Sequence, residues 1–347
     1  IIIMSNTMGE QGTAVALVTK NGAFARAQSS FRNRLIPLTP SAKNRYLLIV
    51  SFACPWATRC LTAINLKGIG EEYIEVRVVH PTWTMTKPDF DAHSGWVFVN
   101  GSGEGVEHMS KTKTVEAKEW HYVWKPISTP DAVKKYYSVR DFYDEHGTSD
   151  TFNGPYTVPI LYDKEMKRIV NNESSEIVRE LNEKFQDVCE NPGIDLYPEA
   201  LRKNIDEMNE WTYHQINNGV YKCGFARTQE AYDEAVESLY EGLDKLEHVL
   251  KTSGWKFLLS DDTITETDVR VFQTLIRFDE VYVVYFKTNK KCIREYEFIY
   301  EYVKRLYAID AFRKATNMLD IKTHYFTSHI ALNPYGIVPA GDPNWLL

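Results

Sequence analysis

The sequence feature that most constrains the fold is a cysteine and a proline placed between an apolar run and an amphipathic segment. Residues 45–52 form a continuous apolar run, which is typical of a strand buried on both faces. Pro55 suits the first position of a helix, and apolar side chains then recur at helical spacing as far as Ile64. Residues 73–79 alternate between polar and apolar and predict a second strand. The chain is therefore expected to build a β-α-β unit with Cys54 at the turn from strand to helix.

The other segments of the first half have weaker patterns. Residues 1–40 show no sustained period and predict an irregular N-terminal arm that lies on the surface. The stretch at about 97–130, which contains several glycines and lysines, predicts an irregular insertion. Residues 132–143 predict a helix, and residues 156–162 and 168–170 predict two strands of a β-hairpin.

The pattern changes near residue 191, which we interpret as a domain boundary. Residues 191–347 show repeated helical spacing without a convincing strand, so they predict an all-helical domain, followed by a C-terminal tail. Within it, Thr265 and Asp268 can form a capping box at the start of a helix. Residues 41–190 predict an α/β domain built on the β-α-β unit. A length of 347 residues suits two domains.

Composition argues against several classes of function. The chain has 40 Lys and Arg against 47 Asp and Glu, a net charge of −7, and no basic block that would favour nucleic acid. Five cysteines without a CxxC pair argue against a secreted disulfide framework and against a structural zinc site. The apolar start Ile1–Met4 is too short for a signal peptide or a membrane span. We expect a cytoplasmic protein with no metal, membrane or nucleic-acid partner.

Cys54 is predicted to be a reactive thiol. A lone cysteine is more often structural, but the first turn of a helix offers free N–H groups and a positive dipole, which can lower a thiol pKa to about 3.5–7.5. Ala57 stands where a CxxC motif would place a resolving cysteine, and Cys60 is expected on another face of the helix. A mixed disulfide at Cys54 then needs an external thiol, and glutathione is the abundant one in a reducing cell.

Two further segments offer what a glutathione site needs. A cis bond between Val158 and Pro159 would leave the backbone of Val158 free to pair with a cysteinyl group. Glu173 can take an ammonium group, and Ser174 with nearby helix N–H groups can hold a carboxylate. Simple helix capping explains this pair equally well, with Ser174 or Ser175 as the capping residue.

Seven motifs spread between about Arg45 and Gly336 resemble those of Xi-class glutathione transferases, the glutathionyl-hydroquinone reductases. They are residues 51–59 around Cys54, 94–98, 157–163, 169–178, 217–226, 277–283 and 324–334. The resemblance implies a thioredoxin-like, glutathione-binding domain over residues 41–190, an all-helical glutathione-transferase domain over residues 191–347 that binds substrate and dimerises, and therefore a homodimer. This chain has Gly154 and Pro155 where relatives often carry a basic residue.

The resemblance also implies a role for each matched residue. Cys54 would attack the sulfur of a glutathionyl-hydroquinone, and a second glutathione would resolve the mixed disulfide. Tyr221 matches the proton donor, while Tyr282 and Tyr325 match tyrosines that line the aromatic pocket and help keep the cysteine ionised. A phenol suits the task because cleaving a thioether at an aromatic carbon needs a proton delivered to that carbon. The residues matched to glutathione contacts are Trp96, Tyr156, Thr157, Val158, Glu173 and Ser174.

Three other interpretations remain open from the sequence. The tyrosines and tryptophans could be ordinary core residues, and Trp83, Trp120 and Trp124 are assigned to that role. An Omega-type thiol transferase or dehydroascorbate reductase would share the cysteine but not the tyrosines. A non-catalytic glutathione-binding protein could use the 97–130 insertion to dock a partner. In the leading interpretation, the partners are glutathione and quinone-derived glutathione conjugates.

Overall fold

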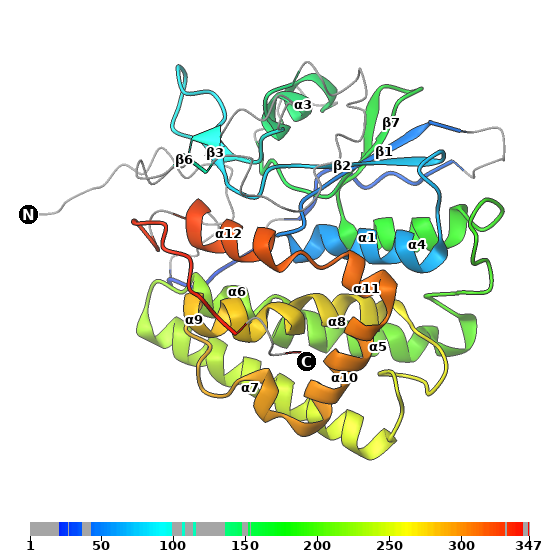
Figure 1. Ribbon diagram of the computed structural model, residues 1–347, viewed down its shortest axis with the longest axis vertical. Helices are drawn as coiled ribbons and strands as arrows, with labels where there is room; N and C mark the ends of the chain where they lie inside the picture. Colours follow the sequence, from blue (N-terminus) through cyan, green and yellow to red (C-terminus); the bar gives the residue numbers. More distant parts are fainter. Residues whose placement is uncertain are drawn as a thin grey trace, which may run out of the picture.

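A four-stranded sheet lies over several layers of helices (Figure 1). The computed structural model describes residues 21–26, 28–36, 43–98, 106–107, 114–115, 136–147, 152, 154–329, 332–342 and 346. The strand order is β2-β1-β7-β8, with β1 parallel to β2 and antiparallel to β7. The strands are β1 (Tyr46–Val50), β2 (Ile74–Val78), β7 (Ile160–Asp163) and β8 (Arg168–Asn171).

Helix α1 (Pro55–Lys67) connects the two parallel strands, so the predicted β-α-β unit is confirmed. Cys54 has an extended backbone and is the N-cap residue, and Pro55 opens the helix. The helix ends at Gly68, whose φ of 62° is a left-handed value that glycine adopts without a steric penalty. All five residues of β1 are buried, as the continuous apolar run predicts. Cys54 is thereby fixed at the carboxyl end of the central strand.

The flanking helices complete a thioredoxin-like arrangement. Helix α3 (Val139–His146) lies on one face of the sheet, and α1 and α4 (Ser174–Lys184) lie on the other (Figure 1). The hairpin of β7 and β8 is confirmed, with its turn at residues 164–167. The face that carries α1 and α4 packs against the helical half of the chain.

Two element boundaries are corrected by the structure. The helix predicted for residues 132–143 begins at Val139, because Ser138 forms a capping box with Asp141; the earlier residues up to 135 lie outside the described ones. The strand predicted from residue 156 begins at Ile160, since Pro159 has no N–H to contribute to a ladder.

The capping of α4 also differs from the prediction. The N-cap residue is Glu173, whose carboxylate accepts a hydrogen bond from the Ser175 backbone N–H at 3.1 Å. Ser174 is the first helical residue and does not cap. Helix capping, one of the two explanations weighed for Glu173, is therefore confirmed for this residue.

Most of the predicted insertion at residues 97–130 lies outside the described residues, and its irregular character is untested. Its described parts are Val97, Phe98 and the short antiparallel pair β5 (Val106–Glu107) and β6 (Thr114–Val115). Trp120 and Trp124 fall outside the described residues. Before it, β3 (Thr84–Met85) pairs with β4 (Ser94–Gly95).

The described residues beyond 191 contain helices and no strand, as predicted for an all-helical domain. The capping box is confirmed: the Thr265 backbone N–H donates to the Asp268 carboxylate at 2.8 Å. The helices are α5 (Arg202–Thr212), α6 (Gly219–Gly224), α7 (Gln229–Ser253), α8 (Glu266–Arg277), α9 (Val283–Tyr285), α10 (Glu297–Ala308), α11 (Asp310–Lys314) and α12 (Met318–Ser328), with π-helical turns at Tyr213–Asn217 and Phe278–Tyr282 and 3₁₀ turns at Glu199–Leu201 and Ile293–Glu295.

A buried hydrogen-bonded contact joins α1 to α8. The Thr58 hydroxyl donates to the Gln273 carbonyl at 2.8 Å, and the Gln273 amide donates to the Thr62 hydroxyl at 3.0 Å. These partners are 211 or more residues apart in the sequence, so the contact ties the helical domain directly to the helix that follows Cys54.

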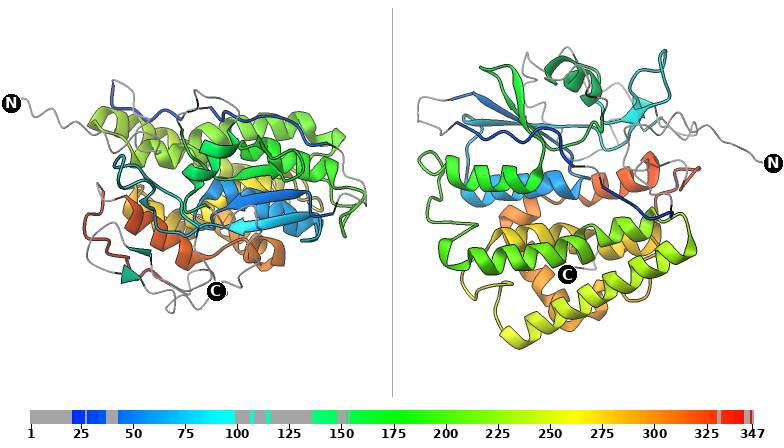
Figure 2. Two further views of the ribbon diagram at one scale, coloured as in Figure 1. Left: turned by 90° about the horizontal axis from the view of Figure 1, so that it is seen from above. Right: turned by 180° about the vertical axis from the view of Figure 1, so that it is seen from behind.

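The described part of the N-terminal arm runs over the surface, as predicted, but buried side chains anchor it to the rest of the protein. Phe24, Phe31 and Leu35 are each only 5% exposed. Seen from behind, the arm crosses the boundary between the sheet and the helices (Figure 2). Its residues 28–36 run beside the start of α4, where the Phe31 backbone N–H donates to the Asn172 side chain at 3.1 Å. The arm therefore belongs to the packed body of the protein.

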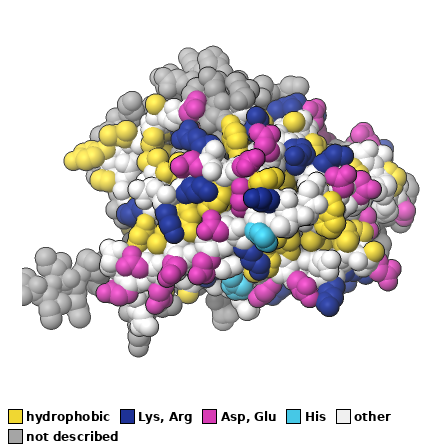
Figure 3. Space-filling model, turned by 90° about the horizontal axis from the view of Figure 1, so that it is seen from below, with side chains coloured by type: hydrophobic (Ala, Val, Ile, Leu, Met, Phe, Trp, Pro, Cys, Tyr) yellow, Lys and Arg dark blue, Asp and Glu magenta, His cyan; other side chains and the backbone are white. Residues whose placement is uncertain are grey.

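The surface seen from below carries both signs of charge. Acidic and basic side chains are interspersed on this face, and neither sign dominates there (Figure 3). None of the helices in the described ranges is long and apolar enough to span a bilayer.

Candidate functional site

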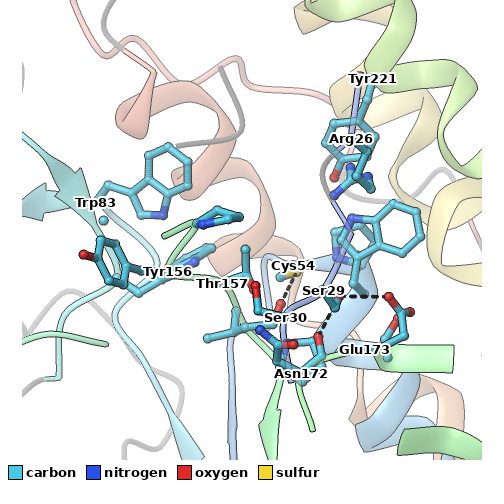
Figure 4. Close-up of a pocket in the computed structure, with 18 of the residues that line it drawn as sticks. Arg26, Ser29, Ser30, Cys54, Trp83, Tyr156, Thr157, Asn172, Glu173 and Tyr221 are labelled. Carbon is cyan, nitrogen blue, oxygen red and sulfur yellow. Dashed lines mark hydrogen bonds between the residues drawn. The ribbon is translucent and has the colours of Figure 1, made fainter. Parts of the chain in front are cut away.

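A cavity of about 270 Å³ opens where the arm, the first domain and the helical domain meet. It brings Cys54, Glu173 and Tyr221 into one site (Figure 4). The lining residues include every predicted site residue except Tyr282: Cys54, Trp96, Tyr156, Thr157, Val158, Glu173, Ser174, Tyr221 and Tyr325.

Cys54 is a partly buried free thiol at the start of α1. Its Sγ donates a hydrogen bond to the Val158 carbonyl oxygen at 3.5 Å, which orients the sulfur toward the segment assigned to glutathione. None of the other four cysteines lines the cavity. Cys60 is fully buried, and burial raises its thiol pKa, so the prediction that it cannot assist Cys54 is supported by its position.

The predicted lowering of the Cys54 pKa is wrong for the protein without a ligand. Burial raises the pKa of the thiol above its ordinary value, although the backbone N–H groups of Ala57 and Trp56 act in the opposite direction. The guanidinium groups of Arg277 and Arg26 also favour the thiolate. The helix N-terminus therefore contributes as expected, but desolvation outweighs it.

Val158 presents a free backbone edge to the cavity. The Val158–Pro159 bond is cis, as predicted. The Val158 backbone N–H has no hydrogen-bond partner among the described residues. The Tyr143 hydroxyl donates to the Thr157 carbonyl oxygen at 2.9 Å and holds the preceding residue in place. An unpaired N–H and a thiol then face the same space, which suits a peptide-like ligand that carries sulfur.

Glu173 places a carboxylate at the opposite end of this segment. It accepts hydrogen bonds from the Ser175 hydroxyl and from the Ser29 hydroxyl of the arm, each at 2.9 Å. Burial pushes its pKa up, but these bonds and the nearby Arg59 outweigh burial and hold the pKa below its usual value. An ionised carboxylate in the wall can bind an ammonium group. Ser174 is buried beside it and also lines the cavity.

Trp96 and Trp83 form an aromatic corner with two buried histidines. The Trp96 ring stacks on His324 with centroids 4.5 Å apart, so this face of the ring is closed to a ligand. Trp83 meets Trp96 edge to face; it is a buried core residue, as the sequence predicted, and it also lines the cavity. Burial lowers the pKa of both His324 and His329, and both rings are neutral near neutral pH.

Three tyrosine hydroxyls form a chain that begins at the cavity wall and continues behind it. The Tyr325 hydroxyl lies 2.6 Å from that of Tyr221 and 3.1 Å from that of Tyr282. Tyr282 is fully buried and does not line the cavity, so the position that the resemblance implies for it in the wall is corrected. Burial raises the pKa of all three phenols, which are therefore protonated at neutral pH.

Two π-helical turns help to position Tyr282 and Tyr221. Tyr282 ends the turn Phe278–Tyr282, and Tyr221 lies four residues after the turn Tyr213–Asn217. A π-helical turn accommodates one extra residue and shifts the register of the next helical segment, and such turns are frequent at functional sites. Gly224 lets α6 approach the Phe286 ring closely, because a Cβ on residue 224 would lie 2.0 Å from that ring.

Sequence reasoning missed the contribution of the arm and of the corner histidines. Arg26 and Ser29 line the cavity from a segment without periodicity, where no local pattern indicates a contact. Asn172, directly before Glu173, holds the arm because its side chain accepts a hydrogen bond from the Phe31 backbone N–H. His324 adjoins Tyr325 within a recognised motif and could have been found from it.

Two family models match more than half of the chain, and curated relatives match almost all of it. Residues 53–184 match the glutathione S-transferase N-terminal domain, and residues 229–305 match the C-terminal domain. The chain is 41% identical to glutathione S-transferase omega-like 2 of Schizosaccharomyces pombe, covering 94% of this chain and 96% of the relative. It is 38% identical to glutathionyl-hydroquinone reductase PcpF of Sphingobium chlorophenolicum, covering 93% and 91%.

A solved structure of a glutathione transferase has a similar fold. The crystal structure of the Xi glutathione transferase ECM4 from Saccharomyces cerevisiae in complex with glutathione is similar, with a TM-score of 0.77 and 36% identity. The similarity covers 92% of this chain and 99% of that one.

Proposed function

This chain belongs to the Xi class of the glutathione S-transferase family, and on this basis we propose that it reduces glutathionyl-hydroquinones to hydroquinones. Glutathione is the reductant and the co-substrate. The observation that carries the proposal is that Cys54 and a protonated Tyr221 line one cavity, while the described residues place no second cysteine there. The relative PcpF, named a glutathionyl-hydroquinone reductase, supports it.

The first chemical step is a proton transfer to carbon. Tyr221 gives its hydroxyl proton to the ring carbon that carries the sulfur, and the neighbouring ring hydroxyl loses its proton and becomes a carbonyl. Tyr325, 2.6 Å away, can pass a replacement proton to Tyr221. The ring carbon is now saturated, and its bond to sulfur can break.

In the second step the Cys54 thiolate attacks the glutathione sulfur. An S–S bond forms and the C–S bond breaks; its electron pair enters the ring, where the carbonyl becomes a phenolate. Protonation of this oxygen gives the hydroquinone. A second glutathione thiolate then attacks the glutathione sulfur of the mixed disulfide and leaves as oxidised glutathione. Overall, the ring carbon exchanges its bond to sulfur for a bond to hydrogen and gains two electrons, while the thioether sulfur of the conjugate and the thiol sulfur of the second glutathione become one disulfide.

The residues of the first domain position glutathione for this attack. The free N–H and the carbonyl of Val158 would pair with the cysteinyl group, close to the Cys54 sulfur. The ionised Glu173 would bind the α-ammonium group of the γ-glutamyl end, with Ser174 beside it. Tyr156 and Thr157 would contact the glutathione backbone, and Trp96 would stack on it. No metal is required by these steps.

The assembly and the location follow from the same assignment. We infer a homodimer, with a glutathione-binding domain over residues 41–190 and a helical domain over residues 191–347. A reducing compartment such as the cytoplasm would supply the glutathione that the second half-reaction consumes.

The experiment that tests the proposal compares a glutathionyl-hydroquinone with a disulfide or dehydroascorbate as the substrate. The purified chain should release hydroquinone from glutathionyl-hydroquinone, and Cys54→Ser should abolish that release. Failure to release hydroquinone, or full activity of Cys54→Ser, would refute the proposal. An Omega-type thiol transferase would instead reduce disulfides or dehydroascorbate as efficiently as it cleaves the conjugate.

A further inference from the structure

Arg26 is a cation of the cavity wall that has no anionic partner among the described residues. Its Nε donates to the Asn218 side chain at 3.0 Å, and its Nη2 is buried without a hydrogen-bond partner. The neighbouring arginine of the wall, Arg32, differs because it is paired with Glu176 at 2.5 Å. A guanidinium group that lines a cavity and has no anionic partner can donate a charge-assisted hydrogen bond to a bound oxygen anion.

Aromatic rings hold the Arg26 guanidinium in a defined place. Its central carbon lies 4.4 Å from the Trp56 ring centroid, 5.1 Å from that of Tyr221 and 5.6 Å from that of Phe24. A guanidinium group stacked on ring faces keeps its N–H groups directed sideways. The group is therefore fixed, although it lies in an arm without regular structure.

The arm is anchored on both sides of Arg26. On one side, the Arg227 backbone N–H donates to the Gly22 carbonyl at 2.9 Å, and Phe24 is buried against Phe225. On the other side, Ser29 donates to the Glu173 carboxylate at 2.9 Å. These anchors fix Arg26 independently of its own hydrogen bond.

The position of Arg26 is between the two groups that act on the substrate. It touches Tyr221, the proposed proton donor, and Trp56, two residues after the nucleophile Cys54. Figure 4 shows it beside Tyr221, on the side of the cavity away from Trp83 and Tyr156. A ring whose carbon faces Tyr221 and whose sulfur faces Cys54 would therefore place its adjacent oxygen near Arg26.

We propose that Arg26 is a catalytic residue that stabilises the ring oxygen of the hydroquinone when this oxygen becomes negative. The inference rests on the proposed function. When the C–S bond breaks, the electron pair enters the ring and the carbonyl next to the reacting carbon becomes a phenolate. Among the described residues, the wall offers no other unpaired guanidinium for this oxygen, because Arg32 is already paired with Glu176. Arg26 would donate a charge-assisted hydrogen bond that strengthens as the charge develops.

Two other roles for Arg26 compete with this proposal: it could stabilise the Cys54 thiolate, or it could hold the arm in place. As a cation near Cys54, Arg26 favours the thiolate, and as a stacked group it holds the arm. Both effects concern parts that every conjugate shares, so their loss would slow all conjugates by one common factor. Stabilising the leaving oxygen depends instead on the acidity of the hydroquinone, which a set of substrates can vary.

The test uses glutathionyl conjugates of hydroquinone and of mono-, di- and trichlorohydroquinone, whose phenols become progressively more acidic. The variants are Arg26→Met, Arg26→Lys and the matched control Arg34→Met. Arg34 belongs to the same arm, but its side chain is 82% exposed and does not line the cavity. The measurement is kcat/KM for hydroquinone release, with thermal unfolding as the check on folding.

Arg26→Met should lower kcat/KM by about 100-fold for the unsubstituted conjugate and by progressively less for the chlorinated ones. Arg26→Lys keeps the charge and should show a smaller loss, and added guanidinium ion should partly rescue Arg26→Met. Arg34→Met should match the wild type. An equal loss across the series in Arg26→Met would overturn this inference alone. Absence of hydroquinone release by the wild type would overturn the proposed function and this inference with it.

Discussion

The hydroxyl oxygens of Tyr221 and Tyr325 lie 2.6 Å apart at the wall of the cavity that holds Cys54. Tyr325 continues the chain to Tyr282, which is fully buried. Because burial raises the pKa of each phenol, the hydroxyls remain protonated at neutral pH. Tyr221 can therefore donate a proton into the cavity, and Tyr325 and Tyr282 can supply a replacement proton along the chain of hydroxyls.

Tyr221→Phe removes the proposed donor while keeping the ring and its packing. Hydroquinone release should fall by about 10²–10⁴-fold, the usual contribution of a positioned acid. Reduction of a mixed disulfide substrate should fall far less, because that reaction breaks an S–S bond and protonates no carbon. Steady-state assays on both substrates provide the measurement. Equal losses on the two substrates would contradict the role of Tyr221.

Tyr335→Phe is the matched control for this experiment. Tyr335 is 74% exposed and does not line the cavity, so the same loss of a hydroxyl should leave both reactions unchanged.

Glu173→Gln should weaken glutathione binding and destabilise the fold. The variant loses the charge that would bind an ammonium group and weakens the cap of α4, which costs about 0.5–2 kcal/mol in the free energy of unfolding. The KM for glutathione should rise, and urea unfolding near neutral pH should show the loss of stability. Glu234→Gln, at an exposed position of α7, is the control that should show neither effect.

The stabilising effect of Glu173 should also depend on pH. Its pKa is lower in the folded protein than its ordinary value of 4.5, so the folded state favours the ionised form. The contribution is present above pH 4.5 and is lost as the pH falls through the folded-state pKa. The stability difference between the wild type and Glu173→Gln should shrink on acidification. A difference that stays constant below pH 4.5 would contradict the assignment.

The reactivity of the Cys54 thiol without a ligand should increase with pH above neutrality. Since burial raises its pKa, only a small fraction is ionised near pH 7, and alkylation by iodoacetamide should speed up as the pH rises. Arg26→Met should shift the midpoint to still higher pH, because Arg26 favours the thiolate. A rate that is already on a plateau at neutral pH would show instead that the helix N-terminus dominates.

Features that depend on neighbours in the sequence could be predicted. The turn that presents Cys54 follows from an apolar run, a proline and helical spacing, all within about twenty residues. The box of Thr265 and Asp268 needs only a spacing of three. The start of α3 was predictable by the same rule from Ser138 and Asp141, but the apolar spacing before them suggested a longer helix. Local signals of different kinds can therefore disagree.

Features that depend on tertiary contacts could not be predicted. Ser29 and Glu173 are 144 residues apart, and Arg26 and Asn218 are 192 apart. The residues of the arm have no period, so nothing in the sequence indicates that they reach the cavity. The direction of the Cys54 pKa shift depends on how completely the surroundings exclude water, which is a property of the packed fold.

The most direct test of the Cys54 mechanism is the intact mass of the protein after incubation with a glutathionyl-hydroquinone. We expect one added glutathionyl group, located on Cys54 by peptide mapping, together with one hydroquinone released. Free glutathione should remove the adduct, Cys54→Ser should not form it, and Cys292→Ser, a control cysteine outside the cavity, should form it normally. Release of hydroquinone without any adduct, or an adduct on a different cysteine, would contradict the central role of Cys54.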